Sequence, residues 1–219
     1  ASAKLDPTVI NGGIINSIKN NAKLGNGEWS VVESDESDGS FLDLPVTYSV
    51  ITNIDKEHMD FYTNLNQLKQ KFKKLIDKTP TFGKSFICID NKNTRNVIQK
   101  CNSVNFSTYG FNKNSNYYIY NVKNNKNFSL FDVKIKNKKS DVTYIKRIKL
   151  NLIGNHNVSN ATAALAVSLN LGIKLKIIKN VFKKFKGIQR RFTKIFSYKG
   201  RDFYDDYAHH PTEISSLLK

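Results

Sequence analysis

Acidic side chains and a histidine follow two short apolar segments in the first third of the chain. Val31 and Val32 lead into the run ESDESD at 33–38, and the apolar segment that ends at Ile54 leads into DKEHMD at 55–60. Both segments have the composition of buried strands, and the carboxyl edge of an open α/β sheet is where ligands bind. The crowded acids of the first run repel one another unless a cation or hydrogen-bond donors lie among them. The pattern predicts a metal or ligand site, and a solvent-exposed acidic loop is the alternative.

The elements that must hold these groups alternate between strands and helices as far as Gly110. Leu65, Leu68 and Phe72 recur at helical spacing and predict an amphipathic helix. The alternation predicts an α/β fold in which a mainly parallel sheet is flanked by helices. In this part we expect strands at 29–33, 46–54, 85–90 and 104–109, and helices at 64–78 and 91–100. The strand at 29–33 is expected to be buried.

The pattern changes after Gly110, where short segments of alternating polarity are separated by Asn- and Lys-rich turns. Such segments predict antiparallel strands, here a small sheet attached to the main one. Two helices, two short strands around Phe196 and Phe203, and a final helix from Pro211 to Lys219 are expected to follow. The predicted strands are 117–122, 128–135 and 142–152, and the two helices are 154–171 and 175–185.

Composition narrows the class of protein. A chain of 219 residues with 39% apolar residues can bury a core. It has no run of about 18 apolar residues that would predict a membrane span, and its start does not resemble a secretory signal. Cys88 and Cys101 lack C-x-x-C spacing, which favours reduced thiols over a disulfide scaffold. We therefore expect a cytoplasmic protein without a membrane partner.

The formal net charge of +17 raises the question of a nucleic-acid partner. Lysine greatly outnumbers arginine, the lysines are scattered along the chain, and the abundance of Lys, Asn and Ile matches an A/T-rich coding sequence. Specific recognition of nucleic acid relies mainly on arginine. We expect no nucleic-acid partner, and a basic nucleic-acid-binding module is the alternative from a different functional class.

Asn157 and Asn160 form a second candidate site. They lie three residues apart near the start of a predicted helix and therefore share a face. An Asn side chain offers both a donor and an acceptor, which matches the edge of a purine. The alternative is that one of the two is simply the N-cap of the helix.

Two further stretches fall at predicted element boundaries. Gly12 and Gly13 follow a short apolar run and predict a tight turn or a close approach of two backbones. Arg190 and Arg191 lie between a helix and a strand, where they contact phosphates or form a solvated turn. The last predicted strand ends in DDYAHHP at 205–211, again with titratable groups at a strand end.

Six motifs together resemble the Mur ligases, which are ATP-dependent amide-forming enzymes of peptidoglycan precursor synthesis. They occur in the family's order and spacing over nearly the whole chain. The pattern is most similar to the alanine-adding members; the murein tripeptide recycling ligases share DD-x-AHHPT, usually lack the HMD form, and are the alternative. The motifs are LDPTVINGGIIN (5–16), VVESDESDGSFL (31–42), TNIDKEHMD (52–60), GNHNVSNA (154–161), GIQRRF (187–192) and DDYAHHPTE (205–213).

The resemblance implies roles for the candidate residues of the first two sites. Glu33 matches the family's Mg²⁺-binding glutamate, and His58 matches the histidine that helps to hold a second Mg²⁺. Asn157 and Asn160 match the asparagines that hold the adenine of ATP. The implied cofactors are therefore ATP and Mg²⁺.

The resemblance also implies roles for the last motifs. Arg191 and Asp206 match the residues that contact the ribose and phosphates of the nucleotide, and with Glu33 and His58 they form the implied catalytic set. Tyr207, His209 and His210 would lie near the substrate cleft. The implied fold is the Mur ligase central ATPase domain at 1–189, followed at 190–219 by the beginning of a Rossmann-like C-terminal domain.

The implied chemistry is amide synthesis in two stages. The carboxylate of UDP-N-acetylmuramate attacks the γ-phosphate of ATP and forms an acyl phosphate, and the amine of L-alanine then displaces phosphate. The family's glycine-rich phosphate loop is missing, because no G-x-x-x-x-G-K-[ST] motif is present in the sequence. We therefore expect these residues to be an incomplete ligase that is inactive alone.

Overall fold

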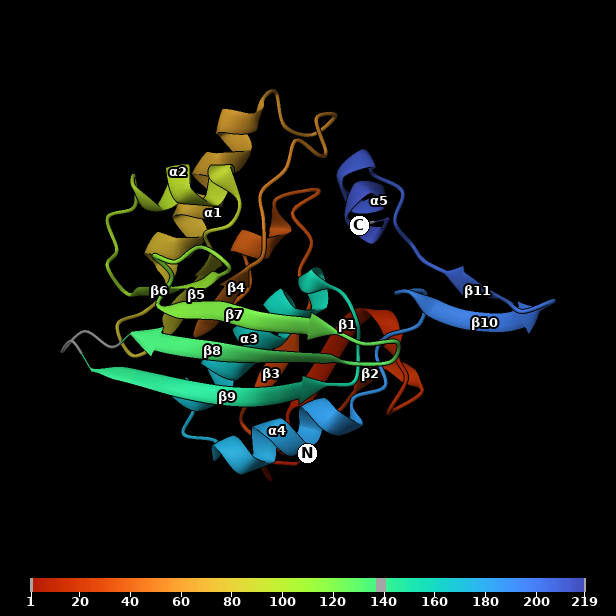
Figure 1. The fold of residues 1–219 in the computed structure, drawn as a ribbon. Coiled ribbons are helices and arrows are strands. Elements are labelled where there is room, and N and C mark those ends of the chain that lie inside the picture. Colours follow the sequence, from red (N-terminus) through yellow and green to blue (C-terminus); the bar gives the residue numbers. More distant parts are fainter. Residues whose placement is uncertain (1, 137–140, 219) are drawn as a thin grey trace. The chain divides into compact units, whose positions relative to one another are not determined.

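The computed structural model describes residues 2–136 and 141–218 (Figure 1). The chain divides into two compact units, which we call the terminal unit (Ala1–Glu33 with Asn180–Lys219) and the central unit (Ser34–Lys179). Part of the predicted lysine-rich turn, at 137–140, and the last residue of the predicted final helix, Lys219, lie outside the described residues.

The central unit is built on a six-stranded sheet with the order β4-β5-β6-β7-β8-β9. The pairings from β4 to β7 are parallel, whereas β7–β8 and β8–β9 are antiparallel. The predicted α/β fold is confirmed, and the antiparallel strands extend the parallel sheet itself. The strands are β4 (Tyr48–Ile51), β5 (Lys84–Cys88), β6 (Phe106–Gly110), β7 (Tyr117–Asn124), β8 (Ser129–Lys136) and β9 (Val142–Leu150).

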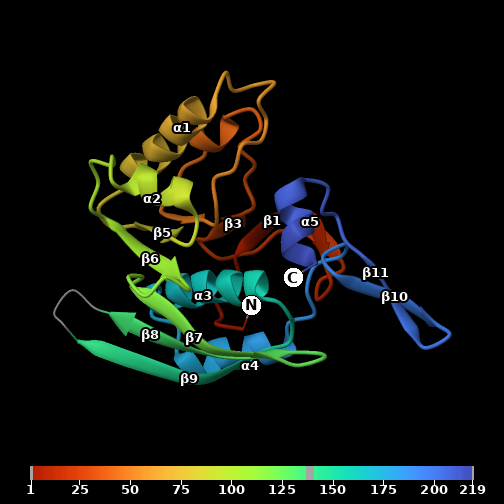
Figure 2. The same ribbon diagram turned by 45° about the horizontal axis from the view of Figure 1, so that its top comes forward.

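Helices cover the parallel part of the sheet, which explains why its strands are apolar on both faces. On one face, α1 (Leu65–Lys78) and α2 (Lys92–Ile98) form a hydrophobic core with β4, β5 and the 3-10 turn η1 (Ser40–Leu42). On the other face, α3 (Asn155–Asn170) contacts the strands from β5 to β8. Figures 1 and 2 show α1 and α2 beside β4 to β6, and Figure 1 shows α3 behind β7 and β8.

The sequence of α1 accounts for its position. Asn64 is the N-cap, and its side chain accepts a hydrogen bond from the backbone N–H of Gln67 at 3.0 Å. Leu68, Phe72 and Ile76 recur on one face and are buried, and the lysines lie on the other face. The predicted helix at 64–78 is therefore confirmed, with Asn64 as its cap.

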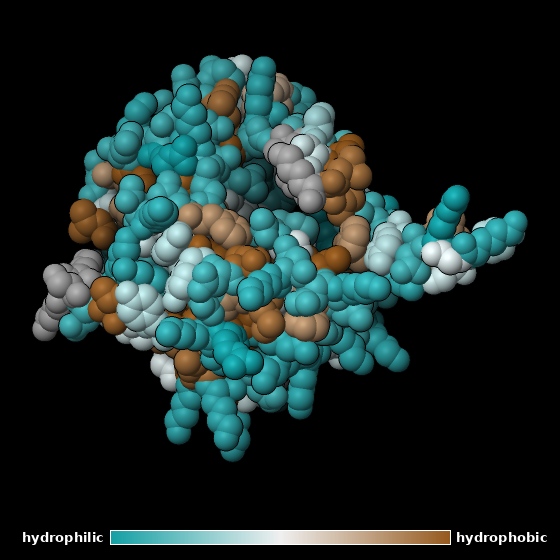
Figure 3. Space-filling model, viewed as in Figure 1, coloured by the Kyte–Doolittle hydropathy of each residue, from teal (hydrophilic) through white to brown (hydrophobic). Residues whose placement is uncertain are grey.

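The antiparallel strands are apolar on one face only. In β8, burial alternates residue by residue, with Phe131 and Val133 fully buried and Lys134 on the opposite face. The face turned away from α3 points to the viewer in Figure 3, where hydrophilic and hydrophobic side chains are mixed. This part of the sheet accordingly has the alternating polarity from which it was predicted.

The terminal unit contains the sheet β2-β1-β3, the hairpin β10–β11 and helix α5. β1 pairs antiparallel with β2 and parallel with β3. Helix α4 begins in the central unit and ends in the terminal unit. The elements are β1 (Thr8–Ile15), β2 (Asn20–Lys23), β3 (Ser30–Val32), α4 (Leu175–Lys184), β10 (Thr193–Tyr198), β11 (Arg201–Asp205) and α5 (Pro211–Leu217).

Two predictions for the terminal unit were wrong. The predicted buried strand at 29–33 is the edge strand β3, and Val31 and Val32 are 56% and 40% exposed. Two adjacent valines predict a strand, but they do not show whether other parts of the chain pack on that strand and bury it. Gly12 and Gly13 do not form a turn; they lie within β1. The other prediction for this pair was a close approach of two backbones. The close neighbour is instead a side chain, since a Cβ on Gly13 would lie 2.6 Å from Cγ2 of Ile188 and 3.8 Å from the carbonyl oxygen of Gln189.

Two predictions from composition, on the cysteines and on membrane spans, can be compared with the described part of the chain. Cys88 is buried, Cys101 is partly buried, and neither forms a disulfide. None of the helices at 2–136 and 141–218 has both the length and the apolar character that crossing a membrane requires.

Candidate functional site

The first candidate site lies at the carboxyl edge of the central sheet, by which we mean the edge where β4, β5 and β6 end. These strands are parallel, so Ile51, Cys88 and Gly110 all reach this edge. The segment DKEHMD follows β4, as predicted. A ligand site at this edge follows the general rule for open α/β sheets.

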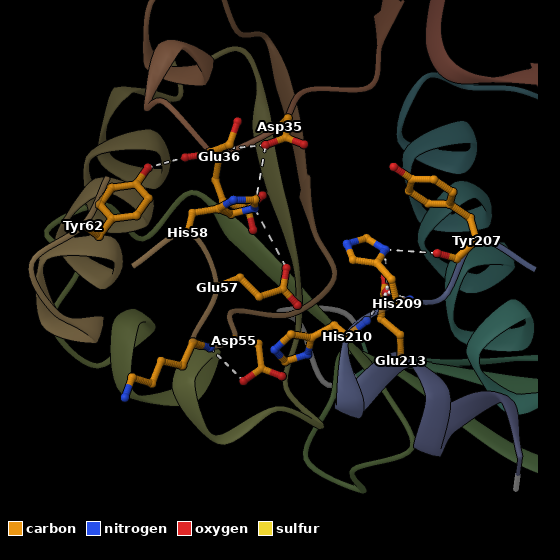
Figure 4. Close-up of polar contacts among 12 residues, drawn as sticks. Asp35, Glu36, Asp55, Glu57, His58, Tyr62, Tyr207, His209, His210 and Glu213 are labelled. Atoms are coloured by element: carbon orange, nitrogen blue, oxygen red, sulfur yellow. Dashed lines mark hydrogen bonds and ion pairs between the residues drawn. The ribbon is translucent and has the colours of Figure 1, made fainter. Parts of the chain in front are cut away.

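His58 is where two acidic segments meet. Its Nε2 lies 4.0 Å from Oδ1 of Asp35 and 4.0 Å from Oε2 of Glu57. One ligand atom each from Glu36, Glu57 and His58 lies within 4.8 Å of the other two. Figure 4 shows the side chain of Glu36 on one loop and those of Glu57 and His58 on a second loop, pointing toward one another. Two carboxylates and an imidazole form a donor set that fits a divalent cation.

The fully buried side chain of Tyr62 supports this group of residues. The hydroxyl of Tyr62 donates a hydrogen bond to the backbone carbonyl of Glu36. The carbonyl of His58 accepts the backbone N–H groups of Phe61 and Tyr62 at 3.0 and 2.9 Å. His58 has a φ of +55°, a left-handed conformation that is uncommon outside glycine. The core therefore holds both acidic segments in place.

The surroundings of Glu36 and Asp35 shift the pKa values of these two acids in opposite directions. Burial raises the pKa of Glu36, and the negative charge of Asp35 raises it further. The backbone N–H of Ser37, which donates to Asp35 at 2.7 Å, lowers the pKa of Asp35. A partly buried carboxylate whose charged form is disfavoured is one that a bound cation stabilises.

Glu33 belongs to the terminal unit. Its Oε2 accepts the backbone N–H of Gly12 at 2.7 Å, and a Cβ on Gly12 would lie 3.3 Å from the same oxygen. Because Gly12 has no side chain, β1 and the segment that carries Glu33 can approach each other closely. Glu33 and His58 fall in different compact units, so their predicted pairing around Mg²⁺ stays a prediction.

Asn157 and Asn160 lie in the first turns of α3. The N-cap is Gly154, with a φ of +96° and no side-chain cap, so the alternative interpretation, in which one of the two asparagines is the N-cap, was wrong. Nδ2 of Asn157 donates to the carbonyl of Ile153 at 2.8 Å, which orients its side chain, and Asn160 is exposed. Ala161, one of several small buried residues of α3, allows close packing on the sheet. The helix thus presents both asparagines near its N-terminus, and their contact with adenine stays a prediction.

The remaining predicted residues gather within the terminal unit. Asp206 accepts the N–H of Phe192 at 2.7 Å and of Ala208 at 2.8 Å, so it joins the two ends of the β10–β11 hairpin. The guanidinium of Arg191 lies 6.0 Å from the ring centroid of Tyr207. Contacts of Arg191 and Asp206 with a nucleotide stay predictions.

The two histidines of this segment are organised by one carboxylate. Nδ1 of His209 lies 3.0 Å from the carbonyl oxygen of Tyr207 and 3.8 Å from Oε2 of Glu213 (Figure 4). The backbone N–H of His210 donates to the same carboxylate oxygen at 3.4 Å. Glu213 therefore stabilises the turn that carries Tyr207, His209 and His210.

Our sequence interpretation missed two acids in the central unit. It singled out neither Glu36 nor Glu57 as a candidate, yet both lie with His58. It also passed over Asp90, which lies two residues after the end of β5. The signal was available in each case, because Asp90 is the last residue of a predicted strand, as Glu33 is, and Glu36 and Glu57 follow within one short turn of a predicted strand end.

Comparison with known proteins identifies the architecture. The family model described as the Mur ligase middle domain matches residues 14–168. The chain belongs to the Mur ligase family. The match crosses both compact units of this Mur ligase chain, and the predicted domain boundary at residues 189 and 190 stays a prediction.

Individual relatives agree with the family. The chain is 53% identical over 218 residues to the UDP-N-acetylmuramate–L-alanine ligase of Pelagibacter ubique, a match that covers 100% of this chain and 47% of that protein. It is 44% identical over 215 residues to the ligase of the same name from Brucella ovis, covering 98% and 46%. The chain thus spans about half the length of the curated relatives it matches.

Solved structures confirm the Mur ligase fold. The UDP-N-acetylmuramate–alanine ligase MurC from Thermotoga maritima superposes with a TM-score of 0.79 at 29% identity, covering 99% of this chain and 47% of that chain. A MurF ligase from Thermotoga maritima, solved in complex with ADP, shares the fold with a TM-score of 0.73 at 18% identity, covering 98% and 50%.

Proposed function

We propose that this chain is the ATP-binding part of a ligase that joins L-alanine to UDP-N-acetylmuramate. The observation that carries the proposal is the 53% identity, across the whole chain, to a relative that bears this name. The arrangement at the carboxyl edge supports it, because a cation-binding group and the start of a helix are what nucleotide chemistry requires.

The reaction that we propose balances as two group transfers. A carboxylate oxygen of UDP-N-acetylmuramate attacks the γ-phosphorus of ATP, the bond to the β–γ bridging oxygen breaks, and ADP leaves. The amine of L-alanine then attacks the acyl carbon, the bond to the phosphate oxygen breaks, and the amine loses a proton. Phosphorylation supplies the leaving group that a free carboxylate lacks.

The residues of this chain position and neutralise the reactants. Glu33 would bind one Mg²⁺, and His58, together with Glu36 and Glu57, would hold a second; when bound, these cations screen the phosphate charge. We propose that Asn157 and Asn160 bind adenine through their donors and acceptors. The described residues need only orient groups and balance charge in this scheme, which agrees with a site made of carboxylates and imidazole.

The terminal unit would complete the nucleotide and substrate contacts. Arg191 would contact a phosphate and Asp206 the ribose, while Tyr207, His209 and His210 lie on the turn that we assign to the substrate side. Asp206 already accepts two backbone N–H groups, so its ribose contact would use the remaining lone pairs of the carboxylate.

Release of ADP by the full-length ligase that carries residues 1–219 tests the proposal. We expect release that requires UDP-N-acetylmuramate, L-alanine and Mg²⁺ together. A murein tripeptide in place of L-alanine is the discriminating substrate. Preference for the tripeptide would reassign the chain to the recycling branch of the family, and the absence of ADP release with either amine would overturn the proposed function.

A further inference from the structure

Asp90 ties together the ends of two strands at the carboxyl edge. It lies two residues after β5, and its carboxylate accepts the backbone N–H groups of Phe111 and Asn112, each at 2.8 Å. These are the first two residues after β6. The turn that leaves β6 is therefore held by a charged acceptor at the end of β5.

The backbone between the strands is shaped to receive this carboxylate. Gly110 has a φ of +141°, and a Cβ at this position would lie 2.6 Å from both carboxylate oxygens of Asp90. A side chain at position 110 would therefore prevent the Asp90 carboxylate from contacting the turn after β6. Glycine at the end of β6 thus permits the clamp.

The same carboxylate is connected to α3 through a thiol. Sγ of Cys88 donates to Oδ2 of Asp90 at 3.7 Å and lies 3.9 Å from Oγ of Ser159. Burial raises the pKa of the Cys88 thiol, so the thiol keeps the proton that it donates. Ser159 lies between the two asparagines that we assign to adenine.

The start of α3 lies at this same edge. Nδ2 of Asn124, the last residue of β7, donates to Oδ1 of Asn155, the first residue of α3, at 3.4 Å. β7 runs parallel to β6, so its end faces the same way as the ends of β5 and β6. The strand ends and the first turns of the helix therefore form one polar surface.

We propose that Asp90 is a positioning residue for the adenine base of the nucleotide. Through Cys88 and Ser159, it fixes where Asn157 and Asn160 stand relative to the sheet. The inference rests on the proposed function, because it takes an adenine nucleotide as the ligand of these asparagines. Asp90 itself touches neither the phosphates nor the reacting carboxylate in this scheme.

The chain offers a matched control at the opposite end of β6. Oδ1 of Asp77 accepts the backbone N–H groups of Asn102 and Ser103 at 2.9 and 3.0 Å, in the turn before β6. Asp77 therefore makes the same kind of clamp far from the carboxyl edge. Any effect of D90N that D77N reproduces belongs to the general loss of a clamp.

The test uses the full-length ligase and two probes, Mg²⁺-ATP and inorganic tripolyphosphate. For D90N we expect the KM and Kd for ATP to rise about tenfold, with kcat changed by less than about twofold. Affinity for tripolyphosphate should not change, because that probe has no base. D77N should leave all of these values at the wild-type level. S159A, which breaks only the link to the helix, should raise the KM for ATP about threefold.

The outcomes separate the two proposals. If the wild-type enzyme releases no ADP with either amine substrate, the proposed function fails before any variant is compared. If the wild type is active, then D90N values equal to those of D77N, or an equal loss of affinity for tripolyphosphate and ATP, overturn the role of Asp90. Should D90N not fold, S159A decides: a higher KM for ATP with unchanged tripolyphosphate affinity supports the role, and an unchanged KM overturns it.

Discussion

At each of the two edges of the central sheet, an aspartate holds a turn next to β6, but the two edges expose different side chains. At the carboxyl edge, Asp90 accepts two backbone N–H groups from the turn that follows β6. At the opposite edge, which we call the amino edge, Asp77 accepts two from the turn that precedes β6. An aspartate that binds a neighbouring turn is therefore not by itself a mark of function.

What differs is the chemistry that each clamp surrounds. The carboxyl edge gathers Glu36, Glu57 and His58 within 4.8 Å, and His58 is held in a left-handed conformation. The amino edge exposes apolar side chains, with Phe82 and Val104 78% and 79% exposed. Titratable groups brought together from distant segments, on a backbone held in uncommon conformations, distinguish the candidate site.

The turns at the amino edge are nevertheless well ordered. Nδ2 of Asn105 donates to the carbonyls of Pro80 and Gly83 at 2.8 and 2.6 Å. A Cβ on Gly83 would lie 1.8 Å from the carbonyl oxygen of Thr47, so that position requires glycine. Substitutions at the amino edge should lower the stability of the fold without altering catalytic activity. The amino edge is therefore the control for the carboxyl edge.

The largest expected effect comes from removing the imidazole at the carboxyl edge. H58A in the full-length ligase should lower kcat by about a hundredfold or more, because the nucleotide phosphates lose a cation ligand. N105A, at the amino edge, should lower the melting temperature and leave kcat within about twofold of wild type. Steady-state ADP release and thermal unfolding give both numbers. A kcat for H58A within threefold of wild type would contradict the metal role.

The two aspartate clamps should contribute similarly to stability. D77N and D90N should each lower the free energy of unfolding by about 1–2 kcal/mol. D77N weakens two hydrogen bonds to Oδ1 and loses the ion pair with Lys73, whereas D90N turns an NH2 group toward one of the two N–H donors. Urea unfolding of the 219-residue chain measures this. A large difference between the two variants would show that the clamps are not equivalent in the fold.

The Asp77 clamp also carries a pH dependence. Burial acts to raise the pKa of Asp77, but hydrogen bonds from Lys73, Ser103 and Asn102 outweigh it, and the folded pKa is lowered. An acid whose folded pKa is depressed stabilises the fold above its unfolded pKa and loses that contribution as the pH falls through the folded value. The difference between wild type and D77N should therefore be complete at pH 7 and shrink below about pH 4.

The fold was largely predictable because its elements are encoded locally. The helical spacing of Leu68, Phe72 and Ile76 gave α1, and the alternation in β8 gave an antiparallel strand. The failure at Val31 and Val32 has a physical cause, since burial depends on what covers a strand and not on the strand's own composition. The sequence therefore predicted element types better than it predicted their exposure.

The candidate site was only partly predictable, because its partners come together through tertiary structure. His58 and Glu33 were assigned through family motifs, whereas Glu36 joins Glu57 and His58 only when its loop folds over Tyr62. The contact between Asp90 and Phe111 spans 21 positions in the sequence. No periodicity in the sequence predicts a contact of that kind, although the position of each acid at a strand end did point to the right edge.

A smaller effect is expected where the core meets the acidic segment. Y62F should lower the free energy of unfolding by about 1 kcal/mol, because the carbonyl of Glu36 loses its donor. It should also raise the Mg²⁺ concentration needed for half-maximal activity about threefold, since Glu36 is held less firmly. Y109F is the control: the Tyr109 hydroxyl donates to the carbonyl of Ile51 at 3.3 Å, a contact that involves neither of the two acidic segments beside His58. An equal Mg²⁺ shift in both variants would rule out a specific role for Tyr62.

The smallest expected effect concerns Cys101, beside the amino-edge clamp. Burial, and then the charge of Asp77, raise the pKa of Cys101 to about 11. The wild-type thiol should therefore react with iodoacetamide at pH 8 roughly a hundredfold more slowly than an exposed cysteine. D77N removes the negative charge and should speed the reaction severalfold by lowering the thiol pKa. The pH profile separates this cause from simple loosening of the turn: loss of the charge moves the midpoint of the profile to lower pH, whereas greater exposure alone raises the rate without moving the midpoint. An unmoved midpoint would mean that burial alone sets the pKa of Cys101, and that the charge of Asp77 serves the turn and not the thiol.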